Sequence, residues 1–424
     1  MSTFFFCHFA SAEDSYIAKP TGKYEVGFKD VRLVNGTLIN DSYLCPGKTD
    51  LWFVKGQNEN DFGQDNQIDF CREIMLRVYY PTNNKHDLPY ENYYLPAMNF
   101  IEDIIRGAKI PGMTEEEIKT LDQVKTFSIK EPKIVDEKFP VLIFDPGAGY
   151  LVQHYEDMIE DIVSHGYIVM ATNNTFIGTS IPFPADSTHP DGRVVQGQFT
   201  STDTDISKGD DSVLNDILFM KKLLDKRDNS ISTFTNHMKL DHVGVFGHSI
   251  GGMALVEAVR EYPYLFQAAM SLDGDPFAFR TLNYDPSELA GFPKTPFLRI
   301  FAASMRDYLK IPKSDQFQLF DNNYYALLAP NENNDSFPYY TDHSSYTDFS
   351  TLKYQPTIEK LFNFYPPGGV IGTADGRHVM QVINDYMVQF FDKYLKPNEH
   401  KPSPNLNSCT AVSNDSMLTC KNTQ

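Results

Sequence analysis

The chain has 424 residues, 41% of them hydrophobic and 22% charged, so it is long and apolar enough to bury a substantial core. Its formal net charge of −19, with no basic stripe to offset it, would repel a phosphate backbone and excludes nucleic-acid binding. No stretch approaches the roughly 18 uninterrupted apolar residues of a membrane-spanning helix. We therefore expect a protein that is soluble or bound to membranes only peripherally.

The amino terminus and the cysteines bear on the cellular compartment. Residues 4–12 combine a short apolar run with small residues and resemble a degenerate signal peptide. The cysteines lack the spacing of a metal site, and four of them form two pairs that are close in sequence and compatible with disulfides. The pairs are Cys45 with Cys71 and Cys409 with Cys420, and Cys7 stands alone. These features favour a secreted or periplasmic protein that needs no metal.

The domain organisation follows from the absence of internal repeats and of long low-complexity segments. We expect an amino-terminal segment over 1–30, one domain over 31–396 and a tail over 397–424. An insertion rich in Tyr and Asn interrupts the domain at about 88–125, and its TEEE sequence from Thr114 resembles the start of a helix.

Short apolar runs alternate with helical patterns along most of the chain. Because such runs are bounded by turn residues, they predict a mostly parallel sheet with helices on both faces, which is an α/β fold. The expected strands are 73–80, 141–145, 167–172, 242–247, 268–273 and 296–303. The expected core helices are 155–165, 211–224, 251–261 and 379–395.

One motif carries the chemistry. The sequence Gly-His-Ser-Ile-Gly at 247–251 directly follows an expected strand and directly precedes an expected helix. A tight turn at that place exposes a serine hydroxyl, and small neighbours relieve crowding around it, as in the nucleophile elbow of α/β hydrolases. This pattern predicts that Ser249 is a nucleophile and that the fold is the α/β-hydrolase fold.

A serine nucleophile needs a base, which in this fold follows it in the chain. Three histidines lie beyond the helix of the motif: His343, His378 and His400. His378 begins an amphipathic helix and His400 lies in the tail, whereas His343 lies in a polar segment after a short strand-like run. We therefore expect His343 to be the base.

Two acids compete to orient that histidine. Asp273 follows the expected strand at 268–273, and Asp307 follows the next one. A carboxylate after either strand can hold the imidazole tautomer and stabilise the imidazolium. Spacing alone leaves both open.

An oxyanion site needs two backbone donors, one after the nucleophile and one in the loop after an early core strand. That loop is Asp-Pro-Gly-Ala-Gly-Tyr at 145–150, in which two glycines allow a close approach to substrate. We expect the N–H groups of Ala148 and Ile250 to form the pair.

Five stretches make the chain resemble the plasma-type, calcium-independent platelet-activating-factor acetylhydrolases and their bacterial relatives, over about residues 70–395. They are FDPGAGY (144–150), SHGYIV (164–169), GHSIGGMALVEAV (247–259), SLDGDPF (271–277) and HSSYTDF (343–349). In that family the acid follows the strand after the nucleophile helix, and the base lies in an H-x-x-[FY]-x-D-F-like segment. The resemblance thus implies Asp273 as the acid and His343 as the base, without a cofactor.

The resemblance also implies an activity. We expect a serine carboxylester hydrolase, a phospholipase-like enzyme of lipid degradation that releases short or oxidised acyl groups from phospholipids. Aromatic residues around 90–105 and 176–183 would then form a rim for acyl chains or a lipid surface. The alternatives are another carboxylesterase, lipase or polyesterase of the same fold, and a catalytically silent hydrolase-fold binding protein.

Overall fold

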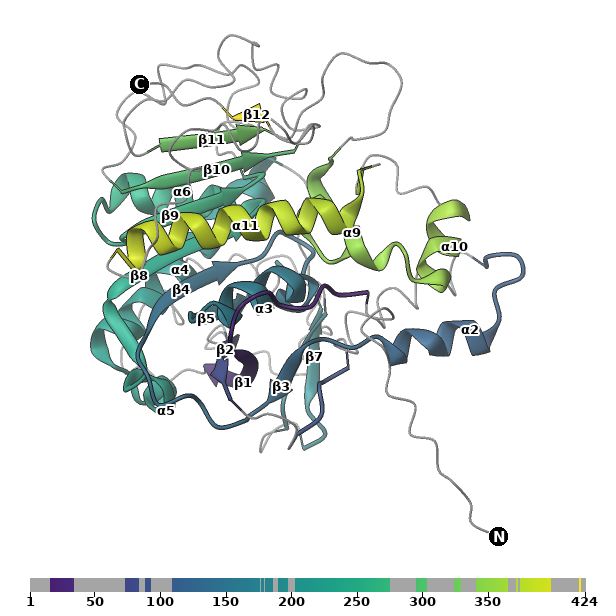
Figure 1. Ribbon diagram of the computed structural model, residues 1–424, viewed down its shortest axis with the longest axis horizontal. Coiled ribbons are helices and arrows are strands. Elements are labelled where there is room, and N and C mark those ends of the chain that lie inside the picture. The colour runs from purple at the N-terminus through teal and green to yellow at the C-terminus, as the bar shows by residue number, and fades with distance from the viewer. Residues whose placement is uncertain are drawn as a thin grey trace.

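The computed structural model describes most of the chain between Tyr16 and Pro397 (Figure 1). The described residues are 16–33, 73–83, 88–92, 109–175, 177–178, 180–185, 190–196, 203–274, 295–302, 324–328, 341–364, 371–372, 374–397 and 419–420. The cysteines at 7, 45, 71 and 409, together with Asp307 and His400, lie outside these residues.

A ten-stranded sheet forms the centre of the described structure, in the order β12-β11-β10-β9-β8-β4-β5-β2-β1-β3. Neighbours from β5 through β11 run parallel, whereas β2 is antiparallel to both β5 and β1. The strands of this sheet are β1 (Glu25–Leu33), β2 (Ile74–Thr82), β3 (Ser128–Lys130), β4 (Phe139–Asp145), β5 (Ile168–Asn173), β8 (Met238–His248), β9 (Ala268–Leu272), β10 (Phe297–Phe301), β11 (Tyr324–Leu328) and β12 (Thr419–Cys420).

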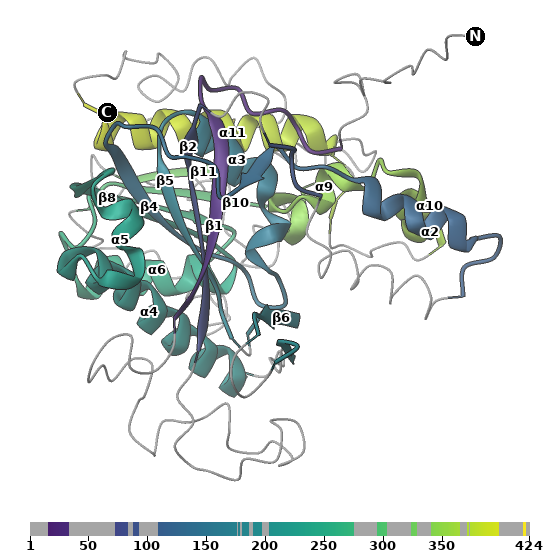
Figure 2. The ribbon, with the colours of Figure 1, turned by 90° about the horizontal axis from the view of Figure 1, so that it is seen from below.

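Helices cover both faces of the sheet (Figure 2). α3 and α11 lie on one face, and α4 and α6 on the other. The α-helices are α2 (Glu115–Lys119), α3 (Glu156–Ser164), α4 (Asp203–Lys226), α5 (Ser232–Thr235), α6 (Ile250–Glu261), α9 (Phe349–Leu352), α10 (Pro356–Phe364) and α11 (Gly376–Leu395). The 3-10 helices are η1 (Thr120–Gln123), η2 (Val152–His154), η3 (Asn229–Ile231) and η5 (His343–Tyr346).

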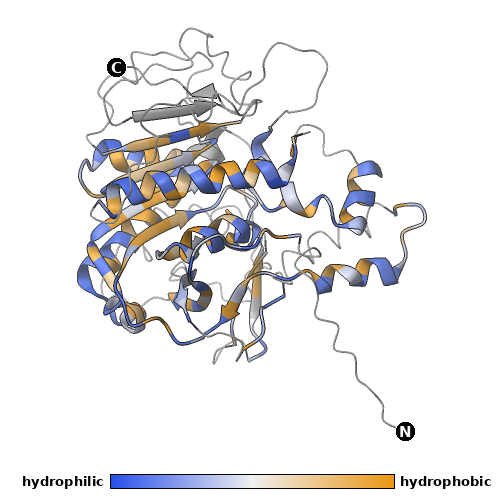
Figure 3. Ribbon diagram, in the orientation of Figure 1, coloured by the Kyte–Doolittle hydropathy of each residue, from blue (hydrophilic) through white to orange (hydrophobic). Residues whose placement is uncertain are grey.

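The strand β4 shows why the sequence forms these layers. Successive side chains of a strand point to opposite faces. Val141 and Ile143 accordingly pack in the cluster that includes α4 and α6. Leu142 and Phe144 pack in the cluster that includes α3 and α11. Both sets are buried, which explains the continuous apolar run, coloured as hydrophobic in Figure 3.

A small helical projection extends from one side of the sheet, where α2 and α10 lie side by side (Figures 1 and 2). Thr114 caps α2 in a capping box with Glu117, as the TEEE sequence indicated. Ile118 and Leu121 pack against Ile358 and Leu361, some 240 residues later in the chain. The carboxyl-terminal part of the expected insertion is thus covered by α10.

The expectation of an α/β-hydrolase fold with a mostly parallel sheet is confirmed. Several elements escaped the sequence patterns. β1 crosses position 30 and pairs along its whole length with β2, and β2 continues through Pro81. The stretch at 180–196, which has no readable period, holds the antiparallel pair β6 (Ser180–Phe183) and β7 (Arg193–Gln196). The proposed domain boundaries stay a prediction.

The helices of the described residues are all too short or too polar to cross a bilayer.

Candidate active site

Ser249 lies at the carboxyl end of β8, immediately before α6. Its backbone is strained, with φ of 54° and ψ of −121°, a conformation that a non-glycine residue rarely adopts. Two hydrogen bonds hold it there: its N–H donates to Leu272 O at 2.9 Å, and its carbonyl accepts from Met253 N at 2.9 Å. The turn expected from the sequence motif is therefore present.

The glycines of the motif are required by close backbone contacts. A Cβ on Gly251 would lie 2.2 Å from Asp145 O, and one on Gly247 would lie 2.6 Å from the Gly251 carbonyl carbon. Gly274, which follows β9, packs against the same turn, and a Cβ on Gly274 would lie 2.5 Å from Ser249 O. Because all these neighbours are backbone atoms, a side chain at these positions would displace the nucleophile turn.

His343 connects Ser249 to an acid. Its Nε2 lies 2.8 Å from Ser249 Oγ, and its Nδ1 lies 2.6 Å from Asp273 Oδ2. Because a carboxylate only accepts, Nδ1 carries the proton and Nε2 accepts from the serine hydroxyl. The structure thus brings together three of the residues singled out in the sequence. Of the other two histidines considered, His378 lies in the first turn of α11.

Asp273 directly follows β9 and is fully buried, whereas about a third of the His343 side chain is exposed. Its second oxygen, Oδ1, accepts from Ala302 N at 2.7 Å, and its own N–H donates to Ile300 O at 2.7 Å. These bonds to the end of β10 fix the direction of the carboxylate. The sequence left Asp273 and Asp307 open, and the Nδ1 partner in the structure is Asp273.

The electrostatics of His343 follow from this pairing. Burial lowers its pKa, but the hydrogen bond and the charge of Asp273, with a smaller contribution from Asp342, outweigh that effect. The pKa of His343 is therefore raised from its ordinary value of 6.5. A histidine held in this way is a stronger proton acceptor than a free imidazole.

The loop after β4 lies beside the nucleophile turn, since a Cβ on Gly147 would lie 3.0 Å from Ser249 Cβ. The N–H groups of Gly147 and Gly149 are engaged, by Tyr155 Oη at 3.0 Å and by Ile177 O at 2.9 Å. The Ala148 N–H between them meets no acceptor among the described residues. At the start of α6, the Ile250 N–H has no acceptor within its helix, as is general for a first turn. The pairing of the Ala148 and Ile250 amides as oxyanion donors stays a prediction.

Two buried side chains behind the site were not found from the sequence. His248, the first variable residue of the G-x-S-x-G motif, has its Nδ1 2.8 Å from Tyr155 Oη and its Nε2 2.9 Å from His343 O. Both side chains are fully buried. The G-x-S-x-G motif assigns no role to its second residue, and no sequence pattern singles out Tyr155.

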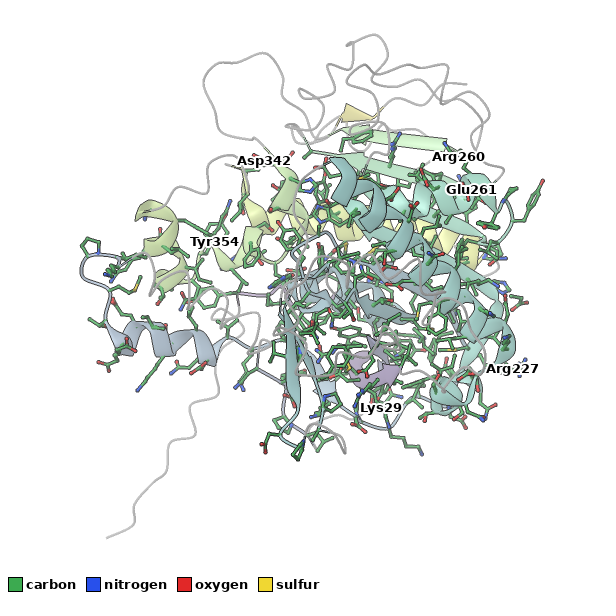
Figure 4. All side chains as sticks on the ribbon, turned by 180° about the vertical axis from the view of Figure 1, so that it is seen from behind. Lys29, Arg227, Arg260, Glu261, Asp342 and Tyr354 are labelled. Atoms are coloured by element: carbon green, nitrogen blue, oxygen red, sulfur yellow. The ribbon has the colours of Figure 1, made fainter. Side chains whose placement is uncertain are left out.

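The segment that carries His343, residues 342–349, is anchored on α3. Its first residue, Asp342, is labelled in Figure 4. The Asp348 carboxylate accepts from the N–H groups of Glu156 at 2.8 Å and Asp157 at 3.1 Å, the first two residues of that helix. The Asp348 N–H donates to His154 O at 2.8 Å, and the Ser344 hydroxyl bonds the Tyr150 hydroxyl. Asp348 belongs to the HSSYTDF stretch, so its presence was visible but its contact was not.

The aromatic rim expected from the sequence is described only in part. Ile181 and Phe183 are buried in a small cluster with Leu151, so this stretch packs inward. Tyr90 is 39% exposed. Within the part of the chain that the structure describes, no group of three His, Cys, Asp or Glu side chains could hold a metal ion.

Comparison with known proteins shows what the chain is similar to. A model of the family "Platelet-activating factor acetylhydrolase, isoform II" matches residues 9–176, which include the loop after β4 and α3 but end before Ser249. No curated protein sequence matches the chain. Among 596 matching chains of solved structures is a ferulic acid esterase from Streptomyces cinnamoneus, with 19% identity and a TM-score of 0.63. The match covers 96% of this chain and 99% of that chain, and at this identity it shows the fold.

The resemblance expected over about residues 70–395 is thus confirmed for residues 70–176, and the family match also covers residues 9–69. Together with the α/β-hydrolase fold, it identifies the chain as a carboxylester hydrolase that resembles the platelet-activating-factor acetylhydrolases.

Proposed function

We propose that Ser249, His343 and Asp273 are the catalytic triad of this hydrolase. The continuous series of hydrogen bonds from Ser249 Oγ through the His343 ring to Asp273 Oδ2, at 2.8 and 2.6 Å, carries the proposal. It occurs at the carboxyl ends of parallel strands, where α/β sheets place their sites. The strained turn at Ser249 and the raised pKa of His343 support the same assignment.

In the first half-reaction the Ser249 hydroxyl attacks the ester carbonyl while its proton passes to His343 Nε2. The tetrahedral oxyanion accepts hydrogen bonds from the Ala148 and Ile250 amides, at the positive end of α6. Asp273 stabilises the imidazolium without taking its proton. His343 then protonates the leaving alcohol as the carbon–oxygen bond breaks, and an acyl-serine remains.

In the second half-reaction a water molecule attacks the acyl-serine. His343 takes one proton from this water and returns it to Ser249 Oγ as the acid leaves. Every proton is exchanged between substrate, water and protein, so the sequence of steps closes without a metal or redox cofactor.

The substrate that the family match supports best is a phospholipid with a short or oxidised acyl chain. A carboxylesterase acting on other esters is the second candidate, because a solved structure with this fold is a ferulic acid esterase. A panel separates them: p-nitrophenyl esters of two to twelve carbons, a 2-acetyl phosphocholine lipid, a long-chain phosphatidylcholine and methyl ferulate. We expect the highest kcat/KM on the acetyl lipid. A higher kcat/KM on methyl ferulate would favour the second candidate.

The triad is tested by Ser249→Ala with p-nitrophenyl butyrate as substrate. We expect kcat to fall by at least about 10³-fold, because the acyl-serine no longer forms. Ser232→Ala, an exposed serine of α5 far from the site, is the matched control and should leave kcat unchanged. Unchanged hydrolysis by Ser249→Ala would contradict the triad. A wild-type protein that hydrolyses none of these esters would instead favour the alternative, a catalytically silent binding protein.

We further propose that the protein is secreted or periplasmic, with Cys45–Cys71 and Cys409–Cys420 bonded, and that it contacts lipid surfaces. The apolar start of the chain and the spacing of the cysteines support the location. Leu88 and Tyr90, 45% and 39% exposed, offer apolar contacts to a lipid surface. Peptide mapping without reduction tests the disulfides. Flotation with phosphatidylcholine vesicles, for the wild type and Leu88→Ser with Tyr90→Ser, tests the contact.

A further inference from the structure

A chain of hydrogen bonds behind the triad joins the oxyanion loop to the base. It runs from Gly147 N to Tyr155 Oη at 3.0 Å, from Tyr155 Oη to His248 Nδ1 at 2.8 Å, and from His248 Nε2 to His343 O at 2.9 Å. Its end residues are 196 positions apart, and each is next to or part of the catalytic machinery proposed above. His248 itself is the residue before the nucleophile.

The direction of this chain can be derived from its atoms. The His343 carbonyl can only accept, so His248 Nε2 must carry a proton. Burial, together with the charge of His343, lowers the pKa of His248 well below 6.5, so the ring is neutral and its Nδ1 is bare. Nδ1 therefore accepts from the Tyr155 hydroxyl, and the hydroxyl oxygen accepts from Gly147 N–H. Each group has one arrangement that satisfies all its neighbours.

The neutrality of His248 also suits the reaction. Its ring centroid lies 4.7 Å from that of His343, with 37° between the planes. A charged neighbour at that distance would oppose the imidazolium that forms on His343 during acylation. His248 instead offers a neutral ring and a donor to the His343 backbone.

We propose that Tyr155 and His248 are positioning residues. Their chain of hydrogen bonds, here called the relay, fixes the position of the Gly147–Ala148 peptide relative to the His343 backbone, on either side of Ser249. The inference rests on the proposed function, because it assigns the relay to the same triad and oxyanion donors. A second link between the same two segments, from the Tyr150 hydroxyl to the Ser344 hydroxyl, points to the same need for register. Neither Tyr155 nor His248 takes part in bond making.

The test removes only the phenolic hydroxyl, with Tyr155→Phe. We expect kcat on p-nitrophenyl butyrate to fall roughly 10- to 100-fold with KM within about two-fold, because donors that are misplaced act on the transition state. An alkyl boronic acid forms a tetrahedral adduct with the serine that uses the same oxyanion amides, so its affinity for Tyr155→Phe should fall by the same factor as kcat/KM. Tyr80→Phe is the matched control: its buried hydroxyl donates to Pro132 O away from the site, and its loss should spare kcat.

A double-variant cycle adds a readout that packing alone would not move. His248→Leu removes both the acceptor for Tyr155 and the donor to His343 O, so the combined variant should be no slower than the slower single variant. Independent, multiplying losses would overturn the relay, as would a Tyr155→Phe kcat within two-fold of Tyr80→Phe. If either of these outcomes occurred while Ser249→Ala lost activity, the proposed role of Tyr155 and His248 would be wrong and the proposed triad would still stand.

The wild-type protein supplies a test that needs no folded variant in the relay. Nitrogen NMR of protein labelled in its histidine rings should show two described histidines with a protonated Nε2 and a bare Nδ1 that do not titrate between pH 5 and 9. One is His248. The other is His154, whose Nδ1 accepts from Leu151 N at 3.0 Å and whose pKa burial lowers to about 3. The signal that remains in His154→Gln, a variant outside the relay, belongs to His248. A His248 ring that is protonated at Nδ1, or that titrates in this range, would contradict the relay.

Discussion

The nucleophile turn and the base segment are held in place by different means. The turn at 247–251 is fixed by backbone atoms that lie so close to Gly247 and Gly251 that no other residue fits at these two positions. The base segment at 342–349 is fixed by polar side chains that contact α3, η2 and the loop after β4, almost 200 residues earlier in the chain. The first arrangement is marked by five consecutive residues, although its backbone also packs on Asp145 at the end of β4, whereas the second depends on side chains that meet only in the folded protein.

This difference predicts how each region responds to substitution. Close backbone packing tolerates no added atom, so damage to the turn should disrupt the fold and the site together. Polar anchoring has several partly redundant bonds, so damage to the base segment should slow the reaction more than it unfolds the protein.

Gly251→Ala should have the largest effect. Its Cβ would lie 2.2 Å from Asp145 O, so the start of α6 must shift and both stability and turnover should be lost. Gly112→Ala is the control for added bulk, because nothing lies within 4 Å of a Cβ at Gly112, although its φ of 77°, unlike that of Gly251, adds backbone strain. We expect a cost of about 1 kcal/mol there, with kcat unchanged. Thermal unfolding and ester hydrolysis measure both. A folded, active Gly251→Ala would contradict the packing argument.

Asp273→Asn should come next, with a loss of about 10⁴-fold in kcat and little loss of fold. The pKa of His343 is raised, and only the neutral ring is a base, so kcat/KM of the wild type should rise with pH through a value above 6.5 and be lost below it. Removing the carboxylate charge should move this acid limb to lower pH. An acid limb that stays in place in Asp273→Asn would mean that another group titrates.

Asp348→Ala should have an intermediate effect, because it removes the acceptor for two N–H groups at the start of α3. We expect kcat to fall about 10- to 100-fold and the free energy of unfolding to fall by about 1 to 2 kcal/mol. Asp375→Ala is the control, since Asp375 caps α11 at an exposed position. It should show a similar loss of stability without the loss of kcat. Equal kcat values in the two variants would remove Asp348 from the anchoring of the base.

The smallest effect should be the pH dependence of stability at the acidic start of α3. Burial raises the pKa of Asp157 to about 6 and that of Glu156 to about 7. Groups with raised pKa values stabilise the fold below about pH 4, and this contribution is lost as the pH rises through 6 to 7. Asp157→Asn should therefore reduce the fall in the urea-unfolding free energy between pH 4 and 7.5, by about 1 to 3 kcal/mol. An unchanged slope would show that Asp157 is ionised throughout.

The same contrast explains what the sequence could predict. The strands of the core, the turn at Ser249 and the glycines around it are encoded by local spacing, so they were predicted to within a few residues. His343 was predicted from chain order and from its neighbours in HSSYTDF, and Asp273 was separated from Asp307 only by family resemblance. Tyr155, His248 and Asp348 act across long distances in the chain. No local period marks such contacts, and β1 was missed because its partner strand lies more than 40 residues away.

Covalent labelling tests the central claim most directly. Treatment of the wild-type protein with a fluorophosphonate, followed by peptide mass spectrometry, should place a single adduct on Ser249. Labelling should become much slower in His343→Ala, because the hydroxyl then lacks its base. An adduct on another serine, or labelling of Ser249 at the wild-type rate without His343, would contradict the triad.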